Sequence, residues 1–504
     1  MDVNRLSSLD VAFLCLERPA TPMHLGAVAV FRPAGRVNPI RLVDVLARRA
    51  ARVPRLRQRV RPTWRPPGGA VWTDDPAFDV ARHIRLHRLP GWPIGDRFGA
   101  AVSAAMARPL DLSRPLWEVH VFAGLADGRF AVLTKLHHAL ADGLRAVELG
   151  VALLDEAAPA GSAAAPAGAG TAGAGTAGVG TAGVGTAGAG TAARTATIAA
   201  GPPGAPSAGA PGWVRPALRT ARTAGTALVR PDRLVRPAAT AAAGLPGLAR
   251  QTGQVLGIAT SLVRSMAPPA PHSPVAASTS AERRLALVRI DLRDVYQIRR
   301  RHGGTVHDVL LAVLTGALRQ WLRQRGHPLD GATLRALIPV GERRRPADRA
   351  GGNQLSGYRC DLPVGEPDPL TMLRAVRAEM DRRKAAGAGR GAGAVSVLAG
   401  RLPPAVHRLA APFAGRGAQL LFDTVVTSVP LPNVPLSLAG AELAEVYPIV
   451  PLADGHALGI AVSTYRRTAY LTLHADPRAV PDLGGLAATV PTALSMLARL
   501  PRAS

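Results

Sequence analysis

The chain has 504 residues, of which 47% are hydrophobic, and this is enough material for two core-sized domains. Its net charge of +27 favours polyanionic surfaces, such as anionic lipid headgroups or nucleic acid. Its two cysteines exclude a disulfide framework and lack the paired spacing of a zinc site. No apolar stretch reaches the roughly 18 residues that a spanning helix needs, and the N-terminus has no signal-peptide pattern. We therefore expect a cytoplasmic protein without a transmembrane helix.

Residues 1–156 alternate strand-like and helix-like segments. Residues 27–31 and 117–124 are short apolar runs typical of strands, whereas residues 39–53 have helical spacing and end before Pro54. Such a mixture favours an α/β (α+β) domain over an all-helical bundle.

The segment with the clearest chemistry is HHALADG, which begins at His137 and ends at Gly143. It follows an apolar run at residues 130–136 that predicts a buried strand. It precedes a helical pattern whose apolar stripe contains Leu144, Val147, Val151 and Leu154. Side chains on such a strand-to-helix turn can face a cleft, where a neutral histidine can accept a proton from a hydroxyl. The alternative is a structural histidine pair followed by Asp142 as a helix cap.

Residues 157–281 have the composition of a linker. A five-residue TAGAG/TAGVG repeat runs from Thr171 to Gly190, lacks large side chains and predicts a flexible segment. At its start, residues 168–173 match the dinucleotide pattern GxGxxG but follow no strand, so we reject a cofactor site there. Residues 213–266 are basic and predict either a spacer or an interfacial amphipathic helix on anionic lipid. Their glycines and prolines favour the spacer.

Residues 282–504 form a second predicted folded region. Thr305 and Asp308 have the spacing of a capping box and precede the apolar stripe of one long helix. Four apolar runs predict strands at residues 334–340, 424–429, 459–465 and 469–475. We therefore expect two folded domains, residues 1–156 and 282–504, separated by the linker.

Further short segments follow one another along the chain in the order that a known family shows. LSSLD begins at Leu6, TPMHLG at Thr21, PLD at Pro109, PLW at Pro115, GNQ at Gly352 and PIVPLADG at Pro448. Together with HHxxxDG, they resemble the wax ester synthase/diacylglycerol acyltransferase family, within the broader chloramphenicol acetyltransferase-like and condensation-domain fold. The resemblance covers both folded regions. It implies two chloramphenicol-acetyltransferase-like subdomains, each a mixed sheet flanked by helices, with a central tunnel.

The resemblance implies an O-acyltransferase that moves a long-chain fatty acyl group from acyl-CoA to an alcohol. It would make triacylglycerol from diacylglycerol, a wax ester from a fatty alcohol, or both. Acyl-CoA is then a co-substrate rather than a bound cofactor, and the chemistry requires neither a metal nor a covalent enzyme intermediate. The expected partners are acyl-CoA, a lipid alcohol and the surface of the plasma membrane or of lipid droplets. Nucleic acid is not expected, because the basic segments lack interleaved aromatic residues and a recognised module.

The resemblance also implies roles for the residues of the HHxxxDG segment. His138 is expected to be the general base that deprotonates the acceptor hydroxyl. His137 is expected to support or line the site, and Asp142 to fix the loop. Gly143 is expected at a turn position where a side chain would intrude.

Two positions depart from the family pattern. His307 precedes Asp308 where members usually carry Asn, and the run from Ser428 to Pro432 reads SVPLP where members usually carry NVPGP. Asp308 and Asn353 are nevertheless expected to support the site, and His307 is expected to be structural rather than a second base. Serine replaces the donor and acceptor of Asn only in part. Two alternatives therefore stay open: a catalytically weakened lipid- or membrane-surface-binding protein of the same fold, and an acyltransferase that acts on a polyketide or peptide intermediate.

Overall fold

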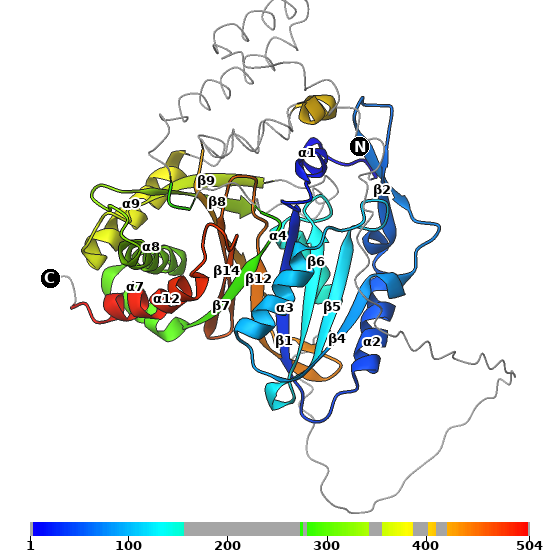
Figure 1. Ribbon diagram of the computed structural model, residues 1–504, viewed down its shortest axis with the longest axis horizontal. Coiled ribbons are helices and arrows are strands. Elements are labelled where there is room, and N and C mark those ends of the chain that lie inside the picture. Colours follow the sequence, from blue (N-terminus) through cyan, green and yellow to red (C-terminus); the bar gives the residue numbers. More distant parts are fainter. Residues whose placement is uncertain are drawn as a thin grey trace, which may run out of the picture. The chain divides into compact units, whose positions relative to one another are not determined.

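The computed structural model describes residues 4–155, 273–275, 280–341, 355–386, 402–409 and 421–501, all within one compact unit (Figure 1). Most of the predicted linker lies outside these residues, including its repeat and its basic segment. Asn353 also lies outside them. The expectations for those positions therefore stay predictions.

The first large sheet has six strands in the order β11-β12-β1-β6-β5-β4. Its neighbouring strands are antiparallel except for β4 and β5, which run parallel. Its strands are β1 (His24–Arg32), β4 (Ile84–Trp92), β5 (Trp117–Leu125), β6 (Phe130–His137), β11 (Ser437–Leu438) and β12 (Ala441–Ile449). The N-terminal part of the chain also contains α1 (Ser8–Leu16), α2 (Pro39–Arg52), α3 (Asp96–Ala107), α4 (Gly143–Ala152) and a small sheet of β2 (Gln58–Pro62) and β3 (Ala70–Asp74).

The second large sheet has six strands in the order β7-β14-β13-β10-β8-β9. In it β10 runs parallel to β8 and β13, and the other pairs are antiparallel. Its strands are β7 (Arg284–Asp291), β8 (Leu334–Gly341), β9 (Leu355–Leu362), β10 (Thr424–Pro430), β13 (Leu458–Tyr465) and β14 (Thr468–Ala475). Four helices gather on one side of this sheet (Figure 1): α7 (Leu292–His302), α8 (Val306–Gln324), α9 (Pro369–Ala386) and α12 (Leu483–Ala498). Two mixed sheets flanked by helices confirm the predicted α/β (α+β) class.

Local sequence patterns account for the elements that surround the HHxxxDG segment. The predicted strands in the N-terminal part are β1, β5 and β6, and those in the C-terminal part are β8, β10, β13 and β14. The predicted helix at residues 39–53 is α2, which begins at Pro39. The side chain of the preceding Asn38 accepts a hydrogen bond from Ile40 N.

Within the described ranges, none of the helices combines the length and hydropathy that crossing a bilayer requires.

The first sheet is not built from residues 1–156 alone, because β11 and β12 come from the C-terminal part of the chain. β12 pairs antiparallel with β1, so that Gly26 lies opposite Ile449. Figure 1 shows β12, in orange, beside the blue β1. The first sheet is therefore complete only with strands from the C-terminal region. The domain boundaries near residues 156 and 282 stay a prediction.

A single carboxylate, Asp155, anchors the β11–β12 hairpin to the end of the N-terminal region. Its Oδ1 accepts hydrogen bonds from Arg49 Nη2 at 2.7 Å and Ala439 N at 3.0 Å, and its Oδ2 accepts from Ser437 Oγ at 2.8 Å and Gly440 N at 2.9 Å. Burial by itself would raise the pKa of Asp155, but these donors lower it to about 2. The ionised carboxylate thus links Arg49 and the β11–β12 hairpin through hydrogen bonds, although these segments are distant in sequence.

Candidate active site

The HHxxxDG segment forms the predicted turn between a buried strand and a helix. β6 ends at His137 and α4 begins at Gly143. His138, Asp142 and Gly143 all line one cavity of about 310 Å³. The structure therefore brings together three of the residues that the sequence singled out and exposes them to the same space.

His138 is positioned by contacts with residues that precede β1. Its ring stacks on that of Phe13 from α1, with centroids 4.0 Å apart and an interplanar angle of 17°. Its backbone N donates a hydrogen bond to Met23 O at 2.8 Å. Burial, helped by the neighbouring His137, lowers the pKa of His138 to about 4. The imidazole is therefore neutral at physiological pH and able to accept a proton.

His137 lies beneath the turn and is not among the residues that line the cavity. Its side chain is fully buried, and its Nδ1 accepts a hydrogen bond from Ala139 N at 2.9 Å. Its Nε2 lies 3.4 Å from Oε2 of Glu17. Of the two placements expected for His137, the structure shows support of the turn rather than exposure to the cavity.

Asp142 is the N-cap of α4. Its backbone is extended, and its Oδ1 accepts a hydrogen bond from Arg145 N at 2.9 Å. The following residue, Gly143, lines the cavity. A Cβ there would lie 3.9 Å from Val429 Cγ2, which is an ordinary contact with the protein, so the expectation that a side chain would intrude stays a prediction about the cavity space.

Replacement of Asp142 by alanine is expected to lower the free energy of unfolding by about 1 kcal/mol, because an N-cap side chain contributes that much. We expect activity to fall as well, since the cap fixes the start of α4 beside His138. Asp142→Asn is the matched control, because asparagine caps helices as well as aspartate does. Urea unfolding and turnover measure the two effects. An alanine variant as stable as the wild type would contradict the capping role.

Asp308 and His307 lie at the start of α8 and are not among the residues that line the cavity. The predicted capping box is present: Asp308 N donates to Thr305 Oγ1 at 3.2 Å, and Thr305 N donates to Asp308 Oδ2 at 2.8 Å. Lys384 Nζ lies 3.9 Å from the buried Asp308 carboxylate. Burial lowers the pKa of His307. These contacts make Asp308 a residue that caps and anchors a buried helix.

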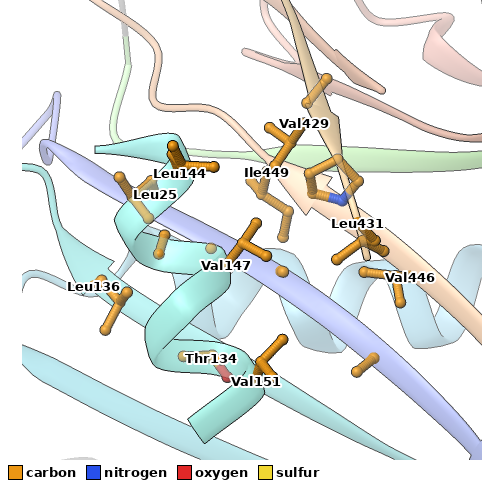
Figure 2. Close-up of a pocket in the computed structure, with 18 of the residues that line it drawn as sticks. Leu25, Thr134, Leu136, Leu144, Val147, Val151, Val429, Leu431, Val446 and Ile449 are labelled. Atoms are coloured by element: carbon orange, nitrogen blue, oxygen red, sulfur yellow. The ribbon is translucent and has the colours of Figure 1, made fainter. Parts of the chain in front are cut away.

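The cavity is predominantly aliphatic, and most of its wall comes from α4, β1, β6, β10 and β12. Figure 2 shows Leu144, Val147 and Val151 of α4 on one side, and Val429, Leu431, Val446 and Ile449 of the β10 segment and β12 on the other. The predicted stripe of α4 therefore faces this cavity. The polar residues along it include Thr134, His138, Asp142, Thr427 and Ser428. The wall of a mainly apolar cavity thus includes the histidine.

Some residues that line the cavity or contact the histidine pair were not predicted to do so from the sequence. Ser428 and Leu431, from the run that departs from the family pattern, line the cavity, so this departure changes its wall directly. Phe13 and Glu17, which contact His138 and His137, come from α1 and the residue after it. The TPMHLG segment pointed to this region but assigned no role to either side chain.

The fold is that of acyltransferases and condensation domains. A wax ester synthase/diacylglycerol acyltransferase from Marinobacter aquaeolei has a TM-score of 0.63 and 23% identity, covering 98% of both chains. The first condensation domain of the CDA synthetase has a TM-score of 0.55 and 14% identity, covering 99% of this chain and 97% of that one. A trichothecene 15-O-acetyltransferase from Fusarium sporotrichioides has a TM-score of 0.56 and 11% identity, over 99% and 95%. At these identities, the likeness concerns the fold.

Sequence comparison identifies the family. The wax ester synthase/diacylglycerol acyltransferase catalytic domain matches residues 6–310, and the C-terminal domain of the same family matches residues 351–498. A probable diacylglycerol O-acyltransferase of Mycobacterium tuberculosis is 31% identical over 499 residues, which cover 98% of this chain and 96% of that protein, and a putative one of Mycobacterium bovis shows the same values. The chain belongs to the wax ester synthase/diacylglycerol acyltransferase family and is an acyltransferase.

Proposed function

We propose that this acyltransferase moves a long-chain acyl group from acyl-CoA to the hydroxyl of a diacylglycerol, with His138 as the general base. The observation that carries this proposal is a neutral histidine in the wall of a mainly aliphatic cavity. An imidazole that acts as a general base must be unprotonated and must face the space in which the hydroxyl is held. His138 meets both conditions, whereas the buried His137 is not among the residues that line the cavity.

The reaction needs one base and no resident cofactor. His138 takes the proton of the acceptor hydroxyl while the oxygen attacks the carbonyl carbon of the thioester. A carbon–oxygen bond forms and the carbon–sulfur bond breaks. The imidazolium then returns its proton to the departing thiolate, so coenzyme A leaves as the thiol and His138 is neutral again. Acyl-CoA is consumed as a co-substrate, and no covalent enzyme intermediate is formed.

The aliphatic cavity is the place that we assign to the acyl chain. Its wall combines α4 with β1, β6, β10 and β12, and Figure 2 shows that most of the labelled side chains on this wall are apolar. Each methylene that leaves water for such a space contributes about 0.8 kcal/mol. A chain buried beside α4 would place its thioester near the start of that helix, where His138 lies.

Diacylglycerol is the acceptor that we favour, because the mycobacterial relatives at 31% identity are named diacylglycerol O-acyltransferases. A fatty alcohol, which would give a wax ester, is the second candidate. Both acceptors reside in lipid phases, and a net charge of +27 attracts a protein to anionic headgroups. We therefore propose that the enzyme works as a peripheral protein at the inner face of the plasma membrane or on lipid droplets.

Release of coenzyme A thiol from palmitoyl-CoA tests this function directly. We expect the purified protein to release thiol when dioleoylglycerol is supplied in anionic vesicles, and to release less with hexadecanol. Vesicles without an acceptor are the control, because they report hydrolysis alone. Faster release with hexadecanol would reassign the enzyme as a wax ester synthase. Release that is independent of either acceptor would exclude both assignments.

A further inference from the structure

Glu17 is a buried carboxylate that lies between two buried histidines. Its side chain is 9% exposed, and its Oε1 and Oε2 lie 3.4 Å from His24 Nε2 and from His137 Nε2 respectively. Its Oε2 also accepts a hydrogen bond from Met23 N at 2.5 Å. Burial by itself would raise the pKa of Glu17, but the two histidines lower it well below its usual range. Glu17 is therefore ionised, although ionised buried groups are costly unless they are paired.

The backbone determines which nitrogen of His137 carries the proton. Ala139 N donates a hydrogen bond to Nδ1 of His137 at 2.9 Å, so Nδ1 presents its lone pair. The ring proton is therefore on Nε2, which lies 3.4 Å from Oε2 of Glu17. Ala139 thus sets the tautomer, and the Glu17 carboxylate is the charged group that faces the protonated nitrogen and favours this orientation of the ring.

The contacts of Glu17 also extend to the residues that hold His138. Met23 donates its N–H to Glu17 and accepts a hydrogen bond from His138 N through its carbonyl oxygen, at 2.8 Å. Glu17 N donates to Phe13 O at 3.2 Å, and the Phe13 ring stacks on His138. The side chain or backbone of Glu17 thus contacts His137, Met23 and Phe13, each of which is bonded to or packed against His138.

We propose that Glu17 is a positioning residue, which holds the His137–His138 turn in the geometry that presents His138 to the cavity. This inference rests on the proposed role of His138 as the base. Glu17 itself touches neither substrate nor the reacting atoms. It acts through the His137 ring and the Met23 backbone, so its loss shifts the His138 imidazole without removing it.

Glu17→Gln is the sharpest test, because the glutamine side chain has the same shape but only one acceptor oxygen. Oε2 of Glu17 meets both Met23 N and His137 Nε2, whereas Oε1 faces His24 Nε2. In either orientation, the glutamine amide therefore places its NH2 group against one of these nitrogens and removes the negative charge between the two histidines. We expect kcat to fall by about tenfold to hundredfold, because a misplacement of a catalytic group by about 1 Å can cost about 10²-fold. The KM for palmitoyl-CoA should stay nearly unchanged. Circular dichroism and Tm report whether the variant is folded.

Glu118→Gln is the matched control. Glu118 is also a carboxylate with little exposure, and it contacts His120 at 3.2 Å and Lys135 at 3.6 Å, but it is not bonded to the His137–His138 turn. We expect Glu118→Gln to lower Tm and to keep kcat. If the two variants lose stability and activity in the same proportion, Glu17 is merely structural and the proposal is overturned.

The tautomer of His137 gives a readout that does not depend on turnover. Imidazole ¹⁵N shifts of the labelled wild-type protein, assigned by the loss of one signal in His137→Gln, are expected to show the proton on Nε2. A proton on Nδ1 would overturn the proposal, even if Glu17→Gln fails to fold. If His138→Ala retains turnover, the proposed function fails, whereas the His137 tautomer still decides the Glu17 contact.

Discussion

His138→Ala is expected to lower kcat for acyl transfer by about 10²–10⁴-fold, the usual contribution of a positioned general base. The protein is expected to stay folded, because the side chain lines a cavity and the turn keeps its backbone hydrogen bond to Met23. Thiol release from palmitoyl-CoA with dioleoylglycerol measures the effect.

His87→Ala is the matched control for this variant. Burial also lowers the pKa of His87 to about 4, but this residue lies on β4 and is not among the residues that line the cavity. We expect its turnover to match that of the wild type. Equal turnover in the His138 and His87 variants would exclude His138 as the base.

The same assignment predicts the pH dependence of the wild-type enzyme. A base whose pKa is lowered to about 4 stays neutral from pH 7 down through pH 6.5, so kcat/KM should remain on its plateau there and decline only as the pH approaches 4. Stability has to be followed in parallel. Histidines with lowered pKa values, including His138, His87 and His474, are protonated first in the unfolded state, so stability falls as the pH decreases from about 6.5 to 4. An inflection in kcat/KM near 6.5, with the protein fully folded, would contradict the lowered pKa.

Gly150→Phe is expected to shift the preference of the enzyme toward shorter acyl chains. Gly150 lies on α4 seven residues after Gly143, hence about 10 Å further along the helix from the His138 turn. It lines the cavity, and a Cβ there would meet no atom within 4 Å, so an added side chain occupies open space. A phenyl ring would take the volume that the distal methylenes of the acyl chain need.

We expect the ratio of kcat/KM for palmitoyl-CoA to that for octanoyl-CoA to fall by at least about tenfold, since misfit of a single methylene can cost 1–3 kcal/mol. Gly150→Ala is the matched control. It leaves most of the cavity open and is expected to stabilise α4 by about 1 kcal/mol, because glycine is a poor residue in a helix interior. An unchanged ratio in the phenylalanine variant would place the acyl chain elsewhere.

The two positions that depart from the family pattern, Ser428 and His307, differ in their relation to the cavity. Ser428 lies on β10 and lines the cavity, so the replacement of the usual asparagine by serine changes the hydrogen-bonding groups inside the cavity. His307 lies at the start of α8 and is not among the residues that line the cavity. Of the two departures, only the one at Ser428 therefore changes the cavity wall.

The sequence by itself determined the local elements and the core of the motif. The apolar run before His137 and the stripe after Gly143 predicted β6 and α4, because strand and helix periodicities depend on neighbouring residues. The spacing of Thr305 and Asp308 predicted a capping box for the same reason. Only the tertiary structure placed β12 beside β1, Ser428 in the cavity wall and Glu17 against His137. These contacts join residues that are distant in the chain, and no local periodicity encodes which distant surfaces will meet.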